Sequence, residues 1–482
     1  MNQTEVGYVV ENHEFLIYLD GFPSIRINDI VENENGQRGW VTSLSGDKVE
    51  VLMLDEGKIA PGQLFKKTPH RLGVPAGEFL LGRAINPLGV PIDGKGLLSK
   101  TKTTKVLELE QNAAGIMYRK FITDQFLTGI TLIDSLLPLG RGQRELVIGD
   151  AHSGKTMFLI DLIVNQKDQG VICIYASIGK SVVSVRDLLD ILRANKTLSY
   201  TMVIAASSTD PAPLIFLTPK TAFTLAEYFQ RQGKHVLVIL DDLGTHAKIY
   251  REMSLLSNKS PGRESYPGDI FYQHAHLLER AGNFRENLGG GSITALPVIE
   301  LTLTDFTTFI PTNLMSMTDG HLLFKSSLHN LGMRPAIDIS LSVTRVGRQT
   351  QDRLTNMLST RIRQLLSHAD ELETISRFSA ELPPQTQMVL RQKQILEEVL
   401  KHEPLTSVPP QIQLILLALC LSSFISDKDK KFMEKNKKVL WQGFLQHPQL
   451  VKITQSVPSL KSDDELIKLL EGVSPILNKI CS

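Results

Sequence analysis

The stretch Gly149-x-x-x-x-Gly154-Lys155-Thr156 has the residue types and the spacing of a loop that holds nucleotide phosphates. Its glycines let backbone N–H groups curl around the phosphates at the N-terminus of a helix. A lysine in this place pairs with the outer phosphates, and a threonine hydroxyl ligates Mg²⁺. The alternative is a glycine-rich turn without a ligand. The pattern predicts a nucleotide site made of Gly149, Asp150, Ala151, His152, Ser153, Gly154, Lys155 and Thr156.

The segments around this loop are those that it requires. The run RELVIG before it is typical of a buried strand, and KTMFLIDLIVNQ after it of a helix. A second β-rich run, HVLVILDDL, ends in Asp241 and Asp242. A carboxylate at the end of a neighbouring strand can orient a magnesium ion, and Asp241 is the candidate because it directly follows the apolar run. The alternative is that either aspartate only caps the next helix.

Three regions follow one another along the chain. Residues 1–69 hold short β-rich runs between turn residues, which indicates a small barrel or sandwich. Residues 70–351 alternate helical segments with continuous apolar runs, including VICIYAS and TMVIAAS, of the kind covered on both faces in a parallel sheet. Residues 352–482 have helical periodicity, which predicts a helical bundle. The expected fold class is thus α/β with flanking domains.

Composition restricts the function classes. The chain has 52 Lys plus Arg and 51 Asp plus Glu. The net charge of +1 therefore does not indicate binding to nucleic acid or to a membrane surface. The three widely spaced cysteines, Cys173, Cys420 and Cys481, favour a reducing, cytosolic compartment. The N-terminal residues do not have the features of a signal peptide. The longest apolar run, 414–425, is too short to span a bilayer and is expected to form a buried helix, followed by a solvated charged helix face over 426–438.

Several long blocks resemble the α and β subunits of rotary F-type ATP synthases. These blocks are GITLIDSLLPLGRGQRELVIGDAHSGKT, YREMSLLSNKSPGRESYPGDIFYQHAHLLERAG, GGGSITALPVIE, IPTNLMSMTDG and GMRPAIDISLSVTRVG. The RGQREL lead-in, the PGRE-x-YPGD segment and RPAI are more similar to α than to β subunits. The resemblance runs from about Val6 past Leu400 and implies an N-terminal small β-barrel, a central P-loop (RecA-like) nucleotide-binding domain and a C-terminal helical bundle.

The resemblance also implies partners, cofactors and location. In this family three α and three β subunits alternate in a ring around the central-stalk γ subunit, and a peripheral stalk holds the ring. The α subunits bind Mg²⁺ and ATP or ADP without turning the nucleotide over. The complex makes ATP from ADP and phosphate using a proton or sodium gradient, or runs in reverse. The expected location is the cytoplasmic face of the bacterial inner membrane, with membrane contact only through the membrane sector and no nucleic-acid partner.

Hydrolysis needs a carboxylate that positions the attacking water. In β subunits of this family it is a Glu directly after a Gly, one strand beyond the P-loop helix, and α subunits usually carry Gln there. This chain has Gly179 followed by Lys180. An ammonium cannot act as a base at neutral pH unless its pKa falls by several units. We therefore expect the chain to hold Mg-ATP and leave it intact.

A contribution to catalysis across a subunit interface is expected from Arg345. The segment LSVTRVG is similar to the α-subunit turn whose arginine reaches the neighbouring β site, with Thr344 in place of the usual Ser. Such an arginine finger stabilises charge on the transferring phosphoryl oxygens and is worth about 10³–10⁵ in rate. The alternative for an arginine in a polar turn is an ordinary surface ion pair.

The chain departs from the family pattern at three places. Between the loop glycines it has Ala151-His152-Ser153 where α subunits typically have Arg-Gln-Thr, and the segment expected to line the adenine is KHEPLTS (401–407) instead of a KQGQYSP-like sequence. Arg334 and Pro335 remain candidate contacts to the base. Most α subunits also have an additional N-terminal helix before the residue that corresponds to Val6, so we expect a different stator attachment or a divergent branch.

Two other functions compete with the α-type role. A catalytic homohexamer of the same superfamily, such as an export ATPase or a Rho-like translocase, would need Glu at position 180. A structural ring protein without nucleotide would not need Lys155, Thr156 and Asp241. The retained phosphate loop and the missing carboxylate favour the non-catalytic, nucleotide-binding subunit.

Overall fold

The computed structural model describes residues 5–46, 48–99, 104–301, 307–376 and 383–481. The chain divides into two compact units, each of which is described below by itself. Unit 1 comprises Met1–Phe121, Arg141–Ala151 and Gln166–His321, and unit 2 comprises Ile122–Gly140, His152–Asn165 and Leu322–Ser482. The very start of the chain, on which the expectation of a missing helix depends, lies outside the described residues. Within the described ranges, no helix has the length and apolar character that crossing a bilayer requires.

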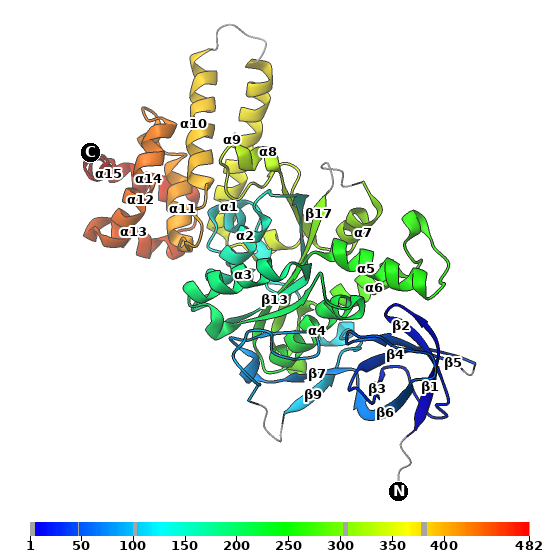
Figure 1. The fold of residues 1–482 in the computed structure, drawn as a ribbon. Helices are drawn as coiled ribbons and strands as arrows, with labels where there is room; N and C mark the ends of the chain where they lie inside the picture. Colours follow the sequence, from blue (N-terminus) through cyan, green and yellow to red (C-terminus); the bar gives the residue numbers. More distant parts are fainter. Residues whose placement is uncertain (1–4, 47, 100–103, 302–306, 377–382, 482) are drawn as a thin grey trace. The chain divides into compact units, whose positions relative to one another are not determined.

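Unit 1 begins with a closed barrel, dark blue in Figure 1. The strands follow the order β1-β2-β5-β4-β3-β6, with β6 returning to pair with β1. Their bounds are β1 (Val6–His13), β2 (Leu16–Asp20), β3 (Asp29–Asn33), β4 (Arg38–Ser45), β5 (Lys48–Met53) and β6 (Leu64–Arg71). Alternating β-branched residues point inward, and Val31, Val41 and Val51 are fully buried in the barrel core. Of the two architectures that the sequence leaves open, the barrel is therefore the one that forms.

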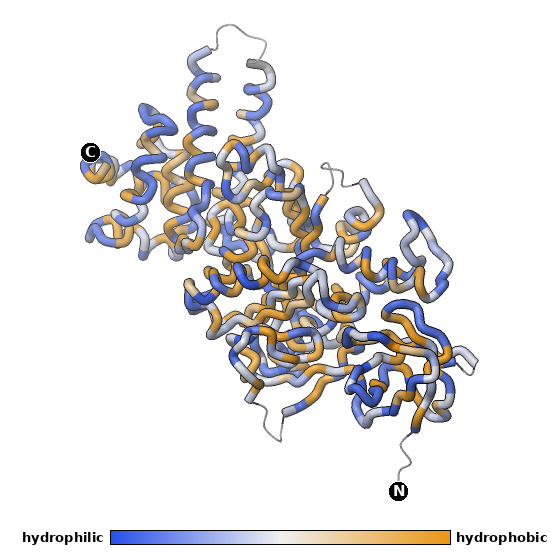
Figure 2. The backbone as a smooth tube through the Cα atoms, in the orientation of Figure 1, coloured by the Kyte–Doolittle hydropathy of each residue, from blue (hydrophilic) through white to orange (hydrophobic). Residues whose placement is uncertain are grey.

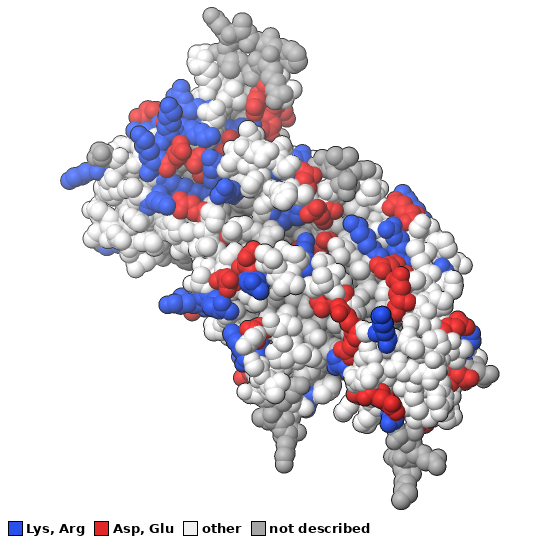
Figure 3. All heavy atoms as spheres, in the orientation of Figure 1, with Lys and Arg blue, Asp and Glu red and all other residues white. Residues whose placement is uncertain are grey.

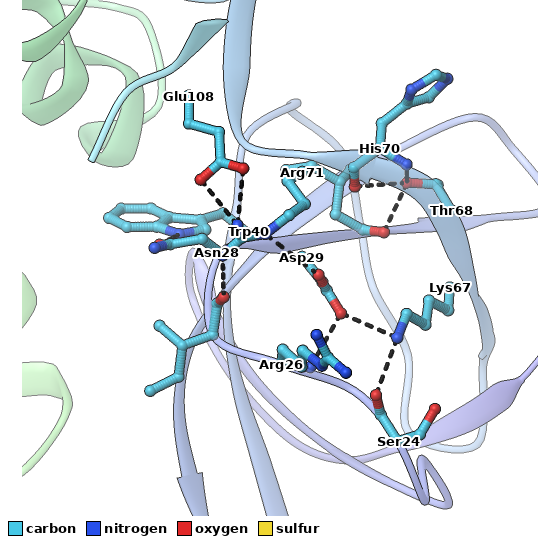
Figure 4. A network of polar contacts seen from close by, with 12 residues as sticks. Ser24, Arg26, Asn28, Asp29, Trp40, Lys67, Thr68, His70, Arg71 and Glu108 are labelled. Carbon is cyan, nitrogen blue, oxygen red and sulfur yellow. Dashed lines mark hydrogen bonds and ion pairs between the residues drawn. The ribbon is translucent and has the colours of Figure 1, made fainter. Parts of the chain in front are cut away.

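A polar network joins the barrel to the next segment of unit 1 (Figure 4). The buried carboxylate of Asp29 lies 3.0 Å from Lys67 Nζ and accepts the backbone N–H of Arg26 at 2.9 Å. Arg71 makes two hydrogen bonds to Glu108, at 2.7 and 2.8 Å. Because Glu108 ends β9 (Lys105–Glu108), which pairs with β7 (Gly73–Ala76), these contacts fasten the barrel to the two-stranded sheet that follows it.

A parallel sheet forms the centre of unit 1. The strands lie in the order β12 (Glu145–Asp150), β17 (Ser292–Leu301), β15 (His235–Asp241), β13 (Val171–Lys180), β14 (Thr201–Ser207) and β8 (Ala84–Ile85), each parallel to its neighbour. Their Val- and Ile-rich runs are orange in Figure 2. The helices α3 (Val182–Ala194), α4 (Ala212–Gln230) and α5 (Leu243–Leu256) pack against these strands. The parallel sheet predicted from the continuous apolar runs is thus confirmed.

One central strand was not predicted from its pattern. β17 lies between β12 and β15, where it is hydrogen-bonded on both sides, although it carries Pro297 opposite Leu240. A proline argues against a central strand because it has no N–H to donate to the ladder. Here nine of the ten residues of β17 are buried, and burial against the layers around the sheet outweighs the missing donor.

Unit 2 carries the C-terminal helices. The long helices α9 (Arg353–Ser376) and α10 (Pro384–Leu400) lie side by side, yellow in Figure 1. They are followed by α11 (Pro410–Leu419), α12 (Lys430–Gln446), α13 (Pro448–Ser456), α14 (Asp463–Gly472) and α15 (Ser474–Cys481). Residues 414–419 of α11 are buried, as expected, but the helix ends before the apolar run does and the chain continues in a 3₁₀ turn at Ser423–Ile425.

Residues 430–438 of the charged run form the start of α12, which is mostly blue in Figure 2. Asp429 caps this helix by accepting the N–H of Phe432 at 2.8 Å. Over α10 and α12, Lys and Arg are interleaved with Asp and Glu on the surface that Figure 3 shows. The solvated helix face is therefore present. The fold class is confirmed, with barrel, parallel sheet and C-terminal helices in the expected order, whereas the domain boundaries after residues 69 and 351 stay a prediction.

Candidate nucleotide site

Three of the strands of unit 1 end beside one another at one edge of its sheet. Parallel strands bring their carboxyl ends to the same edge, where α/β folds bind ligands. β12 ends at Asp150 and leads into the phosphate loop, β15 ends at Asp241, and β13 ends at Lys180. The start of the phosphate loop, the predicted metal ligand and the unusual lysine are therefore brought together.

The two aspartates after β15 have different roles. Asp242 is the cap of α5: its Oδ1 accepts the N–H of Thr245 at 3.0 Å and its Oδ2 accepts the Thr245 hydroxyl at 2.8 Å. Asp241 is buried, and its Oδ2 accepts the hydroxyl of Tyr175 at 2.7 Å. Burial, and then the charge of Asp241, raise the pKa of Tyr175, so the phenol remains a donor. The helix-capping alternative thus holds for Asp242 and not for Asp241.

Lys180 lies between the two aspartates. Its Nζ is 3.7 Å from Asp241 Oδ1 and 3.5 Å from Asp242 Oδ2. Burial opposes the ammonium charge, but the negative charges of Asp241, Asp242 and Glu300 together raise the pKa above the ordinary value for lysine. Lys180 therefore keeps its proton at neutral pH and cannot accept one from water.

A bulge in β13 aims Lys180 at these carboxylates. The register between β13 and β14 shifts between Ile178 and Lys180, and Gly179 adopts a φ of +64°. Such bulges bend the strand and redirect the next side chain. A Cβ on Gly179 would lie 2.7 Å from the Thr245 Cγ2 methyl, so both the conformation and the space require glycine.

Glu300 is a carboxylate at this edge that the sequence did not single out. It is exposed near the end of β17, where it pairs in register with Gly149 of the phosphate loop. Glu300 is the last residue of the run SITALPVIE. If this run had been recognised as a strand, the position of Glu300 near the strand end would have marked it as a candidate. The negative charge of Glu300 helps to raise the pKa of Lys180, so this carboxylate stabilises the charged form of the lysine.

The second part of the phosphate loop lies in unit 2, at the start of α2 (Lys155–Val164). Gly154 precedes the helix with a φ of +88°, and the first N–H groups of a helix have no acceptor within the helix itself. Lys155 is buried and donates to Ser153 Oγ at 3.3 Å, whereas Thr156, His152 and Ala151 are exposed. Backbone donors, a lysine and an exposed hydroxyl are the groups that bind phosphate oxygens.

A cavity of about 200 Å³ opens next to Gly154 within unit 2. Ligand pockets typically measure about 300–1,000 Å³, so this one has room for part of a ligand. The structure brings Arg334 and Pro335, the predicted base contacts, into its wall. The complete lining is Ile130, Gly154, Met157, Phe158, Asp161, His329, Arg334, Pro335, Ala336, His402 and Pro404.

Two buried groups of this cavity have shifted pKa values. Burial raises the pKa of Asp161 to about 6, although the N–H of Leu405 donates to its Oδ1 at 2.6 Å. Burial, and then the charge of Lys437, lower the pKa of His402 to about 4. The neutral imidazole lies 3.9 Å from Asp161 Oδ2, so this approach is not an ion pair at neutral pH. The sequence analysis included His402 in the segment expected to line the adenine. It missed Asp161, because an aspartate in a helical run looks like an ordinary polar position.

Arg345 does not line this cavity. It follows β19 (Val343–Thr344) and is exposed, without an ion pair among the described residues. The turn around it is constrained, because Thr344 Oγ1 donates to the carbonyl of Pro138 at 2.8 Å and a Cβ added to Gly347 would overlap the same carbonyl oxygen. The hydroxyl that Thr344 shares with serine is thus used.

The predicted magnesium role of Asp241 fits this geometry poorly. One of its oxygens accepts a tyrosine hydroxyl and the other faces an ammonium. Mg²⁺ requires a nearly ideal octahedron of oxygen ligands, to which a neighbouring ammonium cannot contribute.

Comparison with known proteins identifies the family. The model of the ATP synthase alpha/beta family, nucleotide-binding domain, matches residues 129–344. ATP synthase subunit alpha of Macrococcus caseolyticus (strain JCSC5402) is 38% identical over 482 residues, which cover 99% of this chain and 95% of that protein. ATP synthase subunit alpha of Staphylococcus aureus (strain bovine RF122 / ET3-1) is 42% identical over 428 residues, 89% of this chain and 85% of that protein. From these matches and from its barrel, sheet and helices, this chain belongs to the family of F-type ATP synthase α subunits.

Proposed function

We propose that this chain is the non-catalytic, nucleotide-binding subunit of an F-type ATP synthase head. The observation that carries the proposal is Lys180, a charged ammonium at the place where hydrolysis needs a carboxylate. The complex makes ATP from ADP and phosphate with a transmembrane ion gradient, or runs in reverse.

The phosphate loop holds the nucleotide in this proposal. Gly149 to Thr156 supply backbone N–H groups, and Lys155 supplies the charge for the outer phosphates. Arg334 and Pro335 contact the base, which is supported by their place in the wall of the cavity beside Gly154. Thr156 and Asp241 are the magnesium ligands predicted from the sequence. Asp241 fits that role poorly, whereas the hydroxyl of Thr156 is exposed.

Arg345 acts outside its own subunit. Its guanidinium extends from a constrained, exposed turn and stabilises the charge of the transferring phosphoryl group in a neighbouring β subunit. The assembly is then a ring of three α and three β subunits around a γ subunit, held by a peripheral stalk. It is attached through its membrane sector to the cytoplasmic face of the inner membrane.

Two substitutions in the assembled complex test this division of roles. Arg345→Ala is expected to lower ATP turnover by about 10³-fold or more while nucleotide stays bound to this subunit. Lys155→Ala is expected to remove the nucleotide from this subunit with a much smaller loss of turnover, because chemistry occurs elsewhere. Steady-state ATPase rates and the nucleotide content of the purified complex measure both effects.

Arg348→Ala is the matched control, since Arg348 is an exposed arginine of the same turn that contacts Thr360 Oγ1 at 3.0 Å. It should leave turnover within about twofold, as for most surface substitutions. Equal losses from the Lys155 and Arg345 variants would show that the site of this chain is itself catalytic. Unchanged turnover in Arg345→Ala would refute the finger role.

A further inference from the structure

One side of α2 leads from the phosphate loop along the cavity of unit 2. Gly154, Met157, Phe158 and Asp161 all line this cavity, and residues three and four apart lie on the same side of a helix. Asp161 follows Gly154 by seven residues, which is about 10 Å along a helix axis. A ligand whose phosphates lie at the start of α2 can therefore place another of its groups beside Asp161.

Backbone hydrogen bonds within unit 2 hold the wall around Asp161. The N–H of Leu405 donates to Asp161 Oδ1 at 2.6 Å, which joins α2 to the segment 401–407. The N–H of His402 donates to the carbonyl of Arg334 at 2.6 Å, which joins the same segment to the other candidate base contacts. The polar groups of the cavity are thus held in place from two sides.

Two buried polar atoms of this wall have no hydrogen-bond partner among the described residues. They are Asp161 Oδ2 and His402 Nε2, which lie 3.9 Å apart. Asp161 is 5% exposed and His402 is 8% exposed, so bulk water reaches neither side chain freely. Native proteins satisfy almost all buried polar atoms with protein, water or a ligand. A ligand that enters the cavity would supply the missing partners.

The two free atoms differ in what they offer to a ligand. Because its pKa is about 6, the carboxyl of Asp161 is mostly ionised at pH 7, and an ionised carboxylate can only accept hydrogen bonds. The neutral imidazole of His402 can either donate or accept at Nε2, depending on its tautomer. The acceptor of Asp161, and not the adaptable His402, therefore decides which ligand group fits.

We propose that Asp161 determines the base preference of the nucleotide site, by accepting a hydrogen bond at Oδ2 from the 6-amino group of a purine. The inference rests on the proposed function, in which the phosphate loop holds the nucleotide. His402 Nε2 donates to the ring nitrogen beside that amino group, and Pro335 packs against the base. A 6-keto purine would present an oxygen to the carboxylate, and two acceptors cannot form a hydrogen bond. The ligand class is thus a 6-aminopurine nucleotide, selected against its 6-keto analogue.

Replacing Asp161 by asparagine inverts the group that faces the cavity. The N–H of Leu405 needs an acceptor, so the amide oxygen of Asp161→Asn takes the place of Oδ1 and the NH₂ group takes the place of Oδ2. This NH₂ group can donate to the 6-keto oxygen of inosine triphosphate (ITP). The other tautomer of His402 then accepts the N–H of the hypoxanthine ring. The preference for the amino group should therefore be lost.

Calorimetric titration of the full-length chain with ATP and with ITP, at pH 7 in one magnesium-containing buffer, measures this preference. The natural chain should bind ATP about tenfold or more tightly than ITP. Asp161→Asn should bind ITP at least as tightly as ATP, so that the ratio of the two dissociation constants shifts by about tenfold or more. Near-ultraviolet circular dichroism checks that the variant keeps its tertiary structure.

Two further variants separate this role from a general effect on the cavity. Asp124→Asn makes the same exchange at an exposed position of unit 2 and should keep the natural preference. His402→Leu removes a hydrogen bond that both bases can form. It should weaken the binding of ATP and of ITP by about fivefold each and leave their ratio within about twofold.

Each result supports or overturns a defined statement. Equal affinities for ATP and ITP in the natural chain would overturn the inference and leave the proposed nucleotide binding intact. A preference for ATP that persists in Asp161→Asn would do the same, and a loss of preference in His402→Leu would assign the selection to His402 instead. Absence of binding of both nucleotides to the natural chain would refute the proposed function itself, and the inference with it.

Discussion

Charge states at single residues of this chain follow from what the fold places beside them. Lys180 stays an ammonium because carboxylates surround it, and their attraction outweighs burial. In the cavity of unit 2 burial outweighs the Leu405 N–H at Asp161 and the charge of Glu403 at His402, so the pKa of Asp161 rises to about 6 and that of His402 falls to about 4. The half-buried Lys180 is therefore held in its charged form, whereas burial works against the charged forms of the more deeply buried Asp161 and His402.

The raised pKa of Asp161 predicts a pH-dependent cost to unit 2. Between the ordinary value of 3.8 and about 6, the folded state holds a proton that the unfolded state has lost, so stability falls as pH rises through this range. Asp161→Asn removes this cost and keeps an oxygen for the Leu405 N–H. At pH 7 it should raise the unfolding free energy by about 2–3 kcal/mol. Chemical denaturation between pH 4 and pH 7 measures the gain, which should shrink towards the acid end.

Asp124→Asn, an exposed substitution in the same unit, serves as the control and should show no such pH-dependent gain. If Asp161→Asn and Asp124→Asn changed stability equally at every pH, the carboxyl of Asp161 would be shown to titrate normally.

At the scale of elements, the end of β13 determines what the nucleotide edge contains. A regular strand would point alternate side chains to opposite faces of the sheet. The bulge at Gly179 interrupts this alternation and directs Lys180 to the ends of β15. The cap of α5 then completes the arrangement, because Asp242 binds the Thr245 whose methyl packs on the bulge.

Gly179→Ala should destabilise unit 1. It places a Cβ at a φ of +64° and 2.7 Å from the Thr245 methyl, and strain of this kind costs about 1–3 kcal/mol. Urea unfolding followed by tryptophan fluorescence measures the loss through Trp40 of unit 1, in a Trp441→Phe background that removes the tryptophan of unit 2.

Thr245→Ser separates the two sources of this cost, because it removes the methyl and keeps the hydroxyl that donates to Asp242. In that background Gly179→Ala should cost less, with only the backbone strain remaining. An equal cost in both backgrounds would mean that the methyl contact carries no energy.

At the scale of the whole molecule, buried histidines make the chain sensitive to acid. His246 and His274 are both buried in unit 1, with ring centroids 5.6 Å apart. Burial lowers the pKa of His274 to about 4, and burial together with the charges of His274 and Lys220 lowers that of His246 well below its ordinary value. The unit folds around neutral imidazoles.

Unit 1 should therefore lose stability as the pH falls from 6.5 towards 4. In this window the unfolded chain binds a proton at His274 that the folded unit excludes, which lowers the unfolding free energy by about 3 kcal/mol. His274→Leu removes this contribution, so the decline in stability over the same window should be less steep. Denaturant titrations at pH 7 and pH 4.5 provide the comparison. His276→Gln, on the same helix but less buried, should leave the decline as steep as in the natural chain.

The sequence by itself determined the elements and the family. The Val- and Ile-rich runs and the helical periodicity after residue 351 are local patterns, read correctly because each depends on neighbours along the chain, whereas the phosphate-loop site stays a prediction. The long ordered blocks placed the chain among α subunits, and two relatives at 38% and 42% identity agree. β17 was not predicted as a strand. Pro297 locally disfavours a central strand, but the burial of β17 by distant segments outweighs the missing N–H.

Only the tertiary structure decided which charges meet. Asp241 and Asp242 are adjacent in the chain and equal candidates by type, yet Tyr175 from another strand and Thr245 from the next helix give them different roles. Lys180 and Glu300 lie far apart in the sequence and reach one edge through the order of β17, β15 and β13. The physical reason is that hydrogen bonds and Coulomb energies depend on distances of a few ångströms, which strand register sets and sequence spacing does not.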